Sequence, residues 1–278
     1  MLDNIQEIEI ADLRRLTQLV QEKYNFDFKN YAMSSFKRRI QRIVELYKFK
    51  TVGALIDKLS SQPAFFEEFL SEVTVNVTEM FRDPVFWALM RDEILPGLIS
   101  NHERISIWHA GCSSGEEVIS MAIILEELNA LDKANIIATD IDTAIIDKAR
   151  KGRINKKNME LHTKNYETFG GRNRLQTYFK EEQDSFVIDS SLLRNVSYRK
   201  HNLVSGSVFS RFDIILCRNV MIYFNQTLQN DVLNTLHQSL FNYGYLAIGS
   251  KESLIWCDIA NKFMVINNEE KVYKKIKE

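Results

Sequence analysis

The sequence contains few of the residues that interrupt or cross-link a chain. Its 278 residues include 10 glycines, 3 prolines and 3 cysteines. Cys112, Cys217 and Cys257 are odd in number and form no C-x-x-C pair. This pattern is typical of reduced, buried thiols rather than of a disulfide framework or a zinc site. We therefore expect neither a disulfide nor a bound metal.

The sequence shows no pattern of a membrane span or a signal peptide, and its net charge is close to zero. No apolar run approaches the ~18 residues that a span needs, and the N-terminal stretch MLDNIQEIEIADL lacks the basic-then-apolar order of a signal peptide. The formal net charge of -1 gives no global attraction to nucleic acid or to an anionic membrane. We expect a cytoplasmic protein whose electrostatic partner sites are local.

The uneven spacing of glycine and proline divides the chain. Residues 1–78 hold helical periods with one glycine and one proline, which predicts an all-α N-terminal domain. Asp83 can cap and Pro84 can open a linking helix over residues 79–100. Residues 101–278 alternate β-rich and helical runs, a pattern typical of a parallel sheet with crossover helices. A polar segment at 153–196 predicts an inserted β-subdomain.

The stretch IWHAGCSSGEEVISMAI joins a β-rich run to a helical one through a glycine turn. Gly111 and Gly115 allow the backbone to pass close to a ligand, although their spacing is not G-x-G-x-x-G. Glu116 and Glu117 stand at the helix start, where they would repel a pyrophosphate and attract an ammonium or sulfonium group. The charges therefore disfavour NAD or ATP.

A second acidic position follows the next β-rich run. Asp140 ends the stretch NIIATD, where a carboxylate can accept hydrogen bonds from ribose hydroxyls. The glycine turn, the acidic helix start and Asp140 together favour S-adenosylmethionine, which joins a ribose to a cationic methionine part. The alternative is that the glutamates only favour the helix dipole and that Asp140 caps the following helix.

Four motifs in order, TVNVTEMFRD, GCSSGEE, TDID and CRNVMIYF, resemble those of the CheR-type chemotaxis receptor methyltransferases. That family methylates receptor glutamates with S-adenosylmethionine and releases S-adenosylhomocysteine. The resemblance covers nearly the whole chain and implies an α/β, Rossmann-like S-adenosylmethionine-dependent methyltransferase fold with an inserted β-subdomain behind an all-α domain. It implies that the cofactor site is lined by Asn76, Thr78, Arg82, Glu117, Asp140, Asn202, Leu203, Arg218 and Asn219.

The resemblance places Arg82 and Tyr223 nearest the transferred methyl. A glutamate with a pKa of about 4.3 is already a carboxylate nucleophile at neutral pH, so no general base is required. Catalysis then reduces to alignment, which Tyr223 and Arg82 can provide by donating hydrogen bonds. His109 and Cys112 depart from the small or polar residues that the family often has at these positions.

The stretch FKRRIQRIVELYK predicts an amphipathic helix. Its apolar positions at helical spacing should face the core of the N-terminal domain: Phe36, Ile40, Ile43 and Tyr47. That leaves three basic residues toward solvent or toward an acidic receptor segment: Arg38, Arg39 and Arg42. The family uses its corresponding helix to contact the cytoplasmic signalling domain of methyl-accepting receptors. A simple solvated face is the alternative.

Two rival functions are weighed against receptor methylation. A nucleic-acid methyltransferase would place prolines after the fourth strand, where this chain has CRNVMIYF, and it would need a stacking pocket for a flipped base. A non-catalytic module that binds the cofactor and signals as a protein partner is disfavoured by the presence of both Arg82 and Tyr223. We expect a monomer.

The stretch NYETF at Asn165–Phe169 resembles the C-terminal receptor peptide that some relatives bind as an added strand on the β-subdomain edge. The hairpin region of this chain, YFKEEQDSFVIDSS, has no glycine, so we predict weak or no binding of such a peptide. The internal NYETF is either a helix end before Gly170 and Gly171, or a segment that occupies the subdomain edge of the same or a neighbouring molecule.

Overall fold

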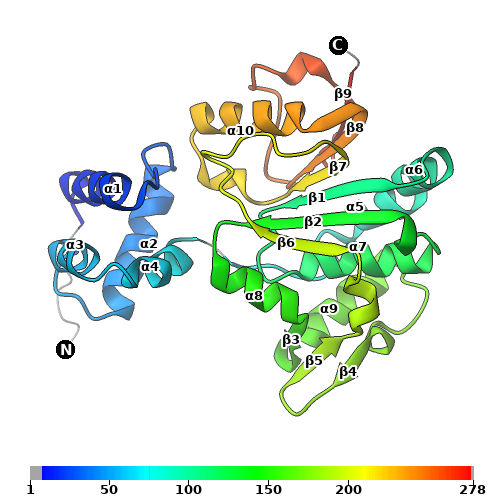
Figure 1. Ribbon diagram of the computed structural model, residues 1–278, viewed down its shortest axis with the longest axis horizontal. Helices are drawn as coiled ribbons and strands as arrows, with labels where there is room; N and C mark the ends of the chain where they lie inside the picture. Colours follow the sequence, from blue (N-terminus) through cyan, green and yellow to red (C-terminus); the bar gives the residue numbers. More distant parts are fainter. Residues whose placement is uncertain (1–7, 75, 277–278) are drawn as a thin grey trace. The chain divides into compact units, whose positions relative to one another are not determined.

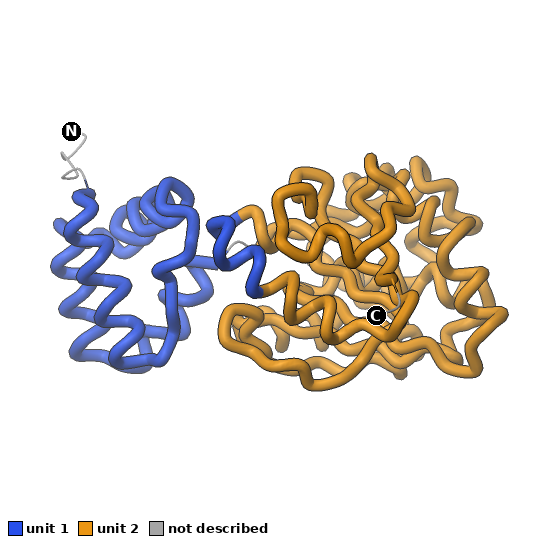
Figure 2. Tube along the Cα trace, turned by 90° about the horizontal axis from the view of Figure 1, so that it is seen from above, with its two compact units in different colours: residues 1–75, 223–231 blue, residues 76–222, 232–278 orange. Residues whose placement is uncertain are grey.

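The structure is a computed structural model that describes residues 8–74 and 76–276. The expectations that rest on residues 1–7, among them the absence of a signal peptide, lie outside the described residues. The chain divides into two compact units, one of residues 1–75 and 223–231 and the other of residues 76–222 and 232–278 (Figure 2). The boundaries differ from those expected, because the helix predicted to link the domains lies within the second unit.

Residues 8–74 form four helices of the first unit, as the helical periods of the sequence predict. They are α1 Ile10–Tyr24, α2 Met33–Leu46, α3 Val52–Ser61 and α4 Phe65–Val73. The Thr51 hydroxyl caps α3 by accepting from the Ala54 N–H at 3.3 Å. Leu16, Phe28 and Ile40 are buried among the helices, so the apolar stripes of the sequence meet in one core.

A seven-stranded sheet forms the centre of the second unit (Figure 1). In spatial order its strands are β6 Val196–Lys200, β2 Ala134–Asp140, β1 Ile105–Ala110, β7 Phe212–Cys217, β8 Leu240–Ile248, β10 Val272–Lys275 and β9 Phe263–Asn267. The first five strands pair in parallel and the last two antiparallel. The predicted parallel sheet is confirmed, and an antiparallel pair of strands, β10 and β9, extends it at one edge.

Helices connect and cover these strands, with α7 and α8 along one face of the sheet (Figure 1). They are α5 Pro84–Leu89, the π-helical turn η1 Met90–Ile94, α6 Leu95–Asn101, α7 Glu116–Glu127, α8 Thr143–Lys151, α9 Lys156–Phe169 and α10 Gln226–Gln238. Short 3-10 turns are η2 Leu131–Lys133, η3 Leu175–Tyr178, η4 Ser190–Leu193, η5 Met221–Tyr223 and η6 Ala260–Lys262.

A separate three-stranded antiparallel sheet lies within the segment expected to be inserted. Its order is β3 Arg153–Asn155, β5 Ser185–Ile188 and β4 Phe179–Glu181. The NYETF stretch is not one of its strands. Asn165–Phe169 forms the end of α9, which stops at Gly170 with φ 81°. The interpretation as a helix end is confirmed, and occupation of the subdomain edge in the same molecule is wrong.

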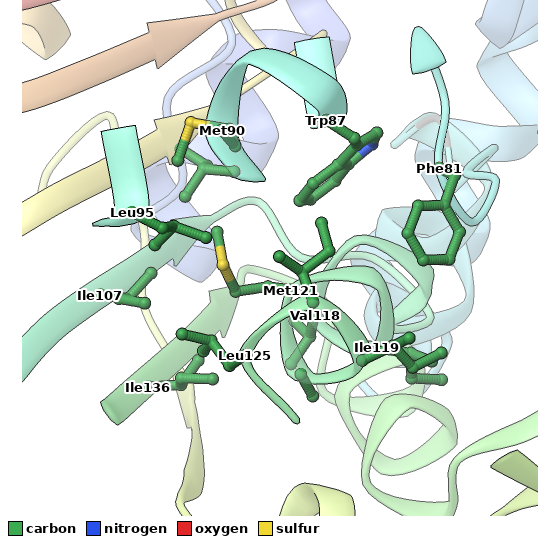
Figure 3. Close-up of a cluster of buried hydrophobic side chains, with 14 of the residues drawn as sticks. Phe81, Trp87, Met90, Leu95, Ile107, Val118, Ile119, Met121, Leu125 and Ile136 are labelled. Carbon is green, nitrogen blue, oxygen red and sulfur yellow. The ribbon is translucent and has the colours of Figure 1, made fainter. Parts of the chain in front are cut away.

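The main core of the second unit fills the space between the sheet and the helices at residues 84–101 and 116–127 (Figure 3). Trp87 and Leu95 from the first of these helical runs meet Met121 from α7 and Ile107 and Ile136 from β1 and β2. Close packing of this kind gives the strands fixed positions. Because β1, β2, β6 and β7 are parallel, their carboxyl ends lie along one edge of the sheet, where ligands of such folds bind.

The three cysteines also belong to the interior. Cys112, Cys217 and Cys257 are free and buried, as the sequence predicts.

Candidate functional site

The turn after β1 brings the backbone close to two neighbouring elements. Gly111 and Gly115 have φ values of 83° and 95°, in the region that glycine favours. A Cβ added to Gly111 would lie 2.5 Å from Val220 Cγ2, and one added to Gly115 would lie 3.0 Å from Ala149 Cβ. These approaches explain both glycines without a ligand. The role of Gly111 in cofactor binding therefore stays a prediction.

Asp140 at the end of β2 is held by backbone N–H groups. Its Oδ1 accepts from Ile141 at 2.8 Å and from Asp142 at 3.1 Å, while Oδ2 accepts from Ser113 at 2.9 Å. Burial raises the pKa of Asp140, and the three hydrogen bonds oppose that rise. A carboxylate has about four acceptor positions, so one position on Oδ2 is left for a further donor such as a hydroxyl.

The two glutamates at the start of α7 have different surroundings. Glu116 is buried and accepts from the Ser114 hydroxyl at 2.7 Å. Glu117 Oε1 lies 2.8 Å from His109 Nδ1, and Oε2 lies 3.5 Å from Arg218 Nη1. Burial alone would raise the pKa of Glu117, but His109 and Arg218 outweigh it and the pKa lies below the ordinary value. Glu117 is thus an ionised group with acceptor positions to spare.

Arg218, just beyond β7, lies between two carboxylates. Its Nη2 is 2.6 Å from Asp83 Oδ2, its Nη1 contacts Glu117, and its guanidinium lies 4.0 Å from the centre of the Phe86 ring. Asp83 was expected to cap the helix that Pro84 opens. That expectation is wrong, because Asp83 has a left-handed backbone and makes no side-chain cap bond, pairing with Arg218 instead. Two carboxylates around one guanidinium leave a net negative charge.

Sequence reasoning missed Glu252, which organises the chain beyond β7 and β8. Its carboxylate accepts from the N–H groups of Asn219 at 3.1 Å, Ile222 at 3.1 Å and Gly249. Burial raises its pKa, and these hydrogen bonds oppose the rise. Asn219 itself has φ 61°. The only signal in the sequence is an acidic residue shortly after the glycine that ends an apolar run, and this is too common to be specific.

The segment that begins at Asn76 is fixed mainly through its backbone. Met80 N–H donates to His162 Nδ1 at 3.2 Å, and Phe81 N–H donates to the Ser120 hydroxyl at 2.8 Å. Asn76 Nδ2 donates to an oxygen of Asp142 at 3.2 Å.

Two predicted site residues in this segment, Thr78 and Arg82, are half-buried. Within the described part of the chain, the Arg82 side chain makes no hydrogen bond or ion pair.

The last predicted cofactor residues of this unit follow β6. Asn202 Oδ1 accepts from the Val204 N–H at 2.9 Å, which forms a local turn, and Leu203 is half-buried. Like Gly111, Asp140 and Arg218, they lie at or just beyond the carboxyl ends of parallel strands. The structure therefore brings the predicted cofactor residues of β1, β2, β6 and β7 to the same edge of the sheet.

Tyr223 belongs to the first unit, where it meets one of the predicted receptor-binding arginines. The Arg39 guanidinium lies 4.2 Å from the centre of the Tyr223 ring and also donates to the Val73 carbonyl. Arg39 is only 8% exposed, and burial lowers its pKa although Tyr223 opposes this. The expectation that Arg39 faces solvent is wrong, whereas Arg38 and Arg42 are exposed.

The period of the helix explains the position of Arg39. It stands three residues after Phe36 and four before Ile43, so it lies on the same face of α2 as these buried residues.

These observations test whether the second unit fits S-adenosylmethionine. From β1 the chain adds β2 and β6 on one side, and it then returns to add β7 on the other side of β1. The topological switch point therefore lies between β1 and β7, beside the turn that follows β1. Glu117 keeps acceptor positions for an ammonium group, and Asp140 keeps one for a hydroxyl. The carboxylates of Asp83 and Glu117 outnumber Arg218, which suits a cation. The fold and the site thus have the features of an S-adenosylmethionine-dependent methyltransferase.

Comparison with known families agrees with this class. The model of the CheR methyltransferase SAM-binding domain matches residues 76–272, and that of the CheR methyltransferase all-alpha domain matches residues 11–74. The chain therefore belongs to the CheR methyltransferase family, and its cofactor is S-adenosylmethionine.

Relatives with similar sequences extend over most of the chain. The Cher3 protein of Pseudomonas putida is 38% identical over 264 residues, 95% of this chain and 96% of its own. The chemotaxis protein methyltransferase 1 of Vibrio cholerae is 31% identical and covers 90% of each chain. The chemotaxis protein methyltransferase of Listeria monocytogenes is 29% identical over 88% of this chain and 93% of its own. Among the described residues, no helix has the length and apolarity to cross a membrane.

Proposed function

We propose that this enzyme transfers a methyl group from S-adenosylmethionine to glutamate side chains of methyl-accepting chemotaxis receptors, giving glutamate methyl esters and S-adenosylhomocysteine. The observation that carries the proposal is the Arg82 guanidinium, which makes no hydrogen bond or ion pair within the described chain although it lies in the cofactor-binding unit. A guanidinium fork matches a carboxylate. The names of the Listeria and Vibrio relatives support a role in chemotaxis.

The cofactor is proposed to bind along the carboxyl edge of the sheet. Glu117 receives the ammonium group of the methionine part on its open acceptor positions, and Asp140 accepts a ribose hydroxyl on Oδ2. The other residues proposed to line the site are Asn76, Thr78, Arg82, Gly111, Asn202, Leu203, Arg218 and Asn219. Leaving a polar partner unsatisfied costs about 1–3 kcal/mol, so Asp140→Ala should weaken the binding of both S-adenosylmethionine and S-adenosylhomocysteine about tenfold or more.

The chemistry needs alignment rather than proton transfer. The bound cofactor supplies an electrophilic methyl group on a positively charged sulfur. The acceptor carboxylate forms an oxygen–carbon bond while the sulfur–carbon bond breaks and its electron pair stays on sulfur, so both charges disappear and no proton moves. Arg82 and Tyr223 hold the carboxylate in line by donating hydrogen bonds.

Recognition of the receptor is proposed to use Arg38 and Arg42 on the exposed face of α2. The Arg38 side chain is exposed. Arg42 forms only a long ion pair with Glu72, at 3.8 Å, and its side chain is exposed as well. Both guanidinium groups are therefore available to an acidic segment. Arg39 is removed from this set because it is buried against Tyr223. The partner is the cytoplasmic signalling domain of the receptor, and the enzyme acts in the cytoplasm as a monomer.

The proposal is tested by incubating the protein with methyl-labelled S-adenosylmethionine and membranes that contain the receptors of its host. We expect label on glutamate residues of a receptor, located by mass spectrometry and released as methanol by mild alkali, as methyl esters are. Tyr223→Phe is the matched variant, because it keeps the ring against Arg39 and removes only the hydroxyl; it should label more slowly. Label on nucleic acid, or on protein in alkali-stable form, would contradict receptor glutamate methylation.

A further inference from the structure

His109 is a polar side chain in the middle of a buried strand. It lies on β1 between Ala138 of β2 and Leu216 of β7, and its side chain is fully buried. An imidazole without water needs a partner for its polar atoms. The partner of Nδ1 is Glu117 Oε1 at 2.8 Å, whereas Nε2 has none within the described residues. Within the described residues, the ring therefore forms a single hydrogen bond, with Glu117.

The direction of this hydrogen bond follows from the state of Glu117. An ionised carboxylate can only accept, so Nδ1 must carry the proton and donate it. Arg218 approaches the other oxygen, at 3.5 Å. The carboxylate is thus held from two sides and cannot rotate freely. Its side chain is still 17% exposed, whereas those of His109 and Arg218 are 0% and 3% exposed. What remains accessible among these three residues is mainly the Glu117 side chain.

We propose that His109 is a positioning residue that orients Glu117 toward the ammonium group of the cofactor. The inference rests on the proposed role of Glu117 and adds a residue that does not touch the ligand. Without the donor, Oε1 would be desolvated by burial and unpaired, which favours a protonated or rotated Glu117. Either change would weaken the attraction for a cation. The effect should be confined to ligands that carry the amino-acid part.

Calorimetric titration with two probes tests this selectivity. S-Adenosylhomocysteine has the ammonium group, and 5′-methylthioadenosine shares its nucleoside but lacks it. Since a hydrogen bond to a charged group is worth about 1.5–3 kcal/mol, His109→Leu should weaken the binding of S-adenosylhomocysteine about tenfold. The affinity for 5′-methylthioadenosine should stay within about twofold of that of the parent protein. His109→Asn, whose Nδ2 can take the place of Nδ1, should restore most of the selectivity.

The outcomes separate the possible failures. Equal losses of affinity for both probes in His109→Leu, or no recovery of the selectivity in His109→Asn, would show that His109 only supports the fold and would overturn the inference. Glu117→Gln is the control: if it leaves the ratio of the two affinities unchanged, the proposed role of Glu117 fails as well. If Glu117→Gln lowers the ratio and His109→Leu does not, Glu117 keeps its role and only the role of His109 is lost.

A measurement on the unchanged protein avoids any problem of folding in the variants. In nitrogen-15 spectra of histidine-labelled protein, His109 should carry its proton on Nδ1. Its signals should shift on addition of S-adenosylhomocysteine and much less on addition of 5′-methylthioadenosine. A proton on Nε2 with Nδ1 bare, or equal shifts with both ligands, would contradict the inference.

Discussion

Two regions of the second unit hold their polar groups in opposite ways. At the ends of β2 and β8, backbone N–H groups hold side chains: Asp140 and Glu252 each accept from three of them. In the segment before α5, side chains from elsewhere hold the backbone. His162 and Ser120 accept from two of its N–H groups there, and the Arg82 side chain makes no hydrogen bond or ion pair within the described chain.

This difference in how the side chains are held suits two different tasks, cofactor binding and substrate alignment. A side chain held by several backbone donors has one orientation before any ligand arrives, which suits a cofactor site. A side chain on a fixed backbone with no partner of its own can still form its hydrogen bonds with an incoming substrate. The contrast therefore supports a role in cofactor binding for Asp140 and one in substrate alignment for Arg82.

The largest effect on stability is expected from removing the Glu252 carboxylate, which accepts hydrogen bonds from three backbone N–H groups. Glu252→Ala leaves three N–H groups without an acceptor, and each loss costs about 1–3 kcal/mol. The free energy of unfolding in urea should fall by about 4 kcal/mol. Glu252→Gln keeps one acceptor oxygen and should lose about half as much. A loss under about 1 kcal/mol in the alanine variant would mean that water replaces the carboxylate.

A smaller and pH-dependent effect is expected from His162, which holds the other region. Burial lowers its pKa to about 4, against an ordinary value of 6.5. Between these values the unfolded chain binds a proton that the folded chain excludes, so stability falls as the pH drops from about 6.5 toward 4, by up to about 3 kcal/mol.

The comparison with His162→Gln isolates this contribution. Glutamine can accept from the Met80 N–H and does not titrate, so the difference in stability between parent and variant should shrink toward acid pH as the parent loses its advantage. Urea unfolding at several pH values measures this difference. A constant difference between pH 7.5 and 4.5 would show that His162 does not titrate as described.

The smallest effect is expected outside both regions, on the exposed face of α2. Replacing Arg38 and Arg42 by glutamine should raise the apparent KM for receptor about threefold and flatten its dependence on salt, because exposed charges are screened beyond about 8–10 Å. Stability should change by less than about 0.5 kcal/mol. Arg39→Gln is the contrasting variant and should destabilise the first unit. If the salt dependence of the KM is unchanged in the double variant, the exposed face of α2 is only a solvated surface and does not bind the receptor.

The sequence predicted the elements better than the contacts between distant residues. Hydrophobic period and glycine placement are local properties, and they were sufficient for the four N-terminal helices, the parallel sheet and the glycine turn. The pairing of Asp83 with Arg218 joins residues 135 positions apart, and no local pattern encodes it. Arg39 is an intermediate case, since its spacing from Phe36 and Ile43 placed it on the buried face, but its charge suggested the opposite.

The central claim is that Asp140 contributes mainly to cofactor binding, whereas Arg82, although it is proposed to line the same site, contributes mainly to substrate alignment. Its most direct test is a paired measurement on Arg82→Ala and Asp140→Ala: the affinity for S-adenosylhomocysteine by calorimetry, and the single-turnover rate of receptor methylation at saturating S-adenosylmethionine. Arg82→Ala should lower the rate on the order of 100-fold, as expected for the loss of charge-assisted hydrogen bonds, and leave the affinity within about twofold. Asp140→Ala should do the reverse. If Arg82→Ala weakens the affinity as much as Asp140→Ala does while the saturated rate stays near that of the parent, the division of tasks is contradicted.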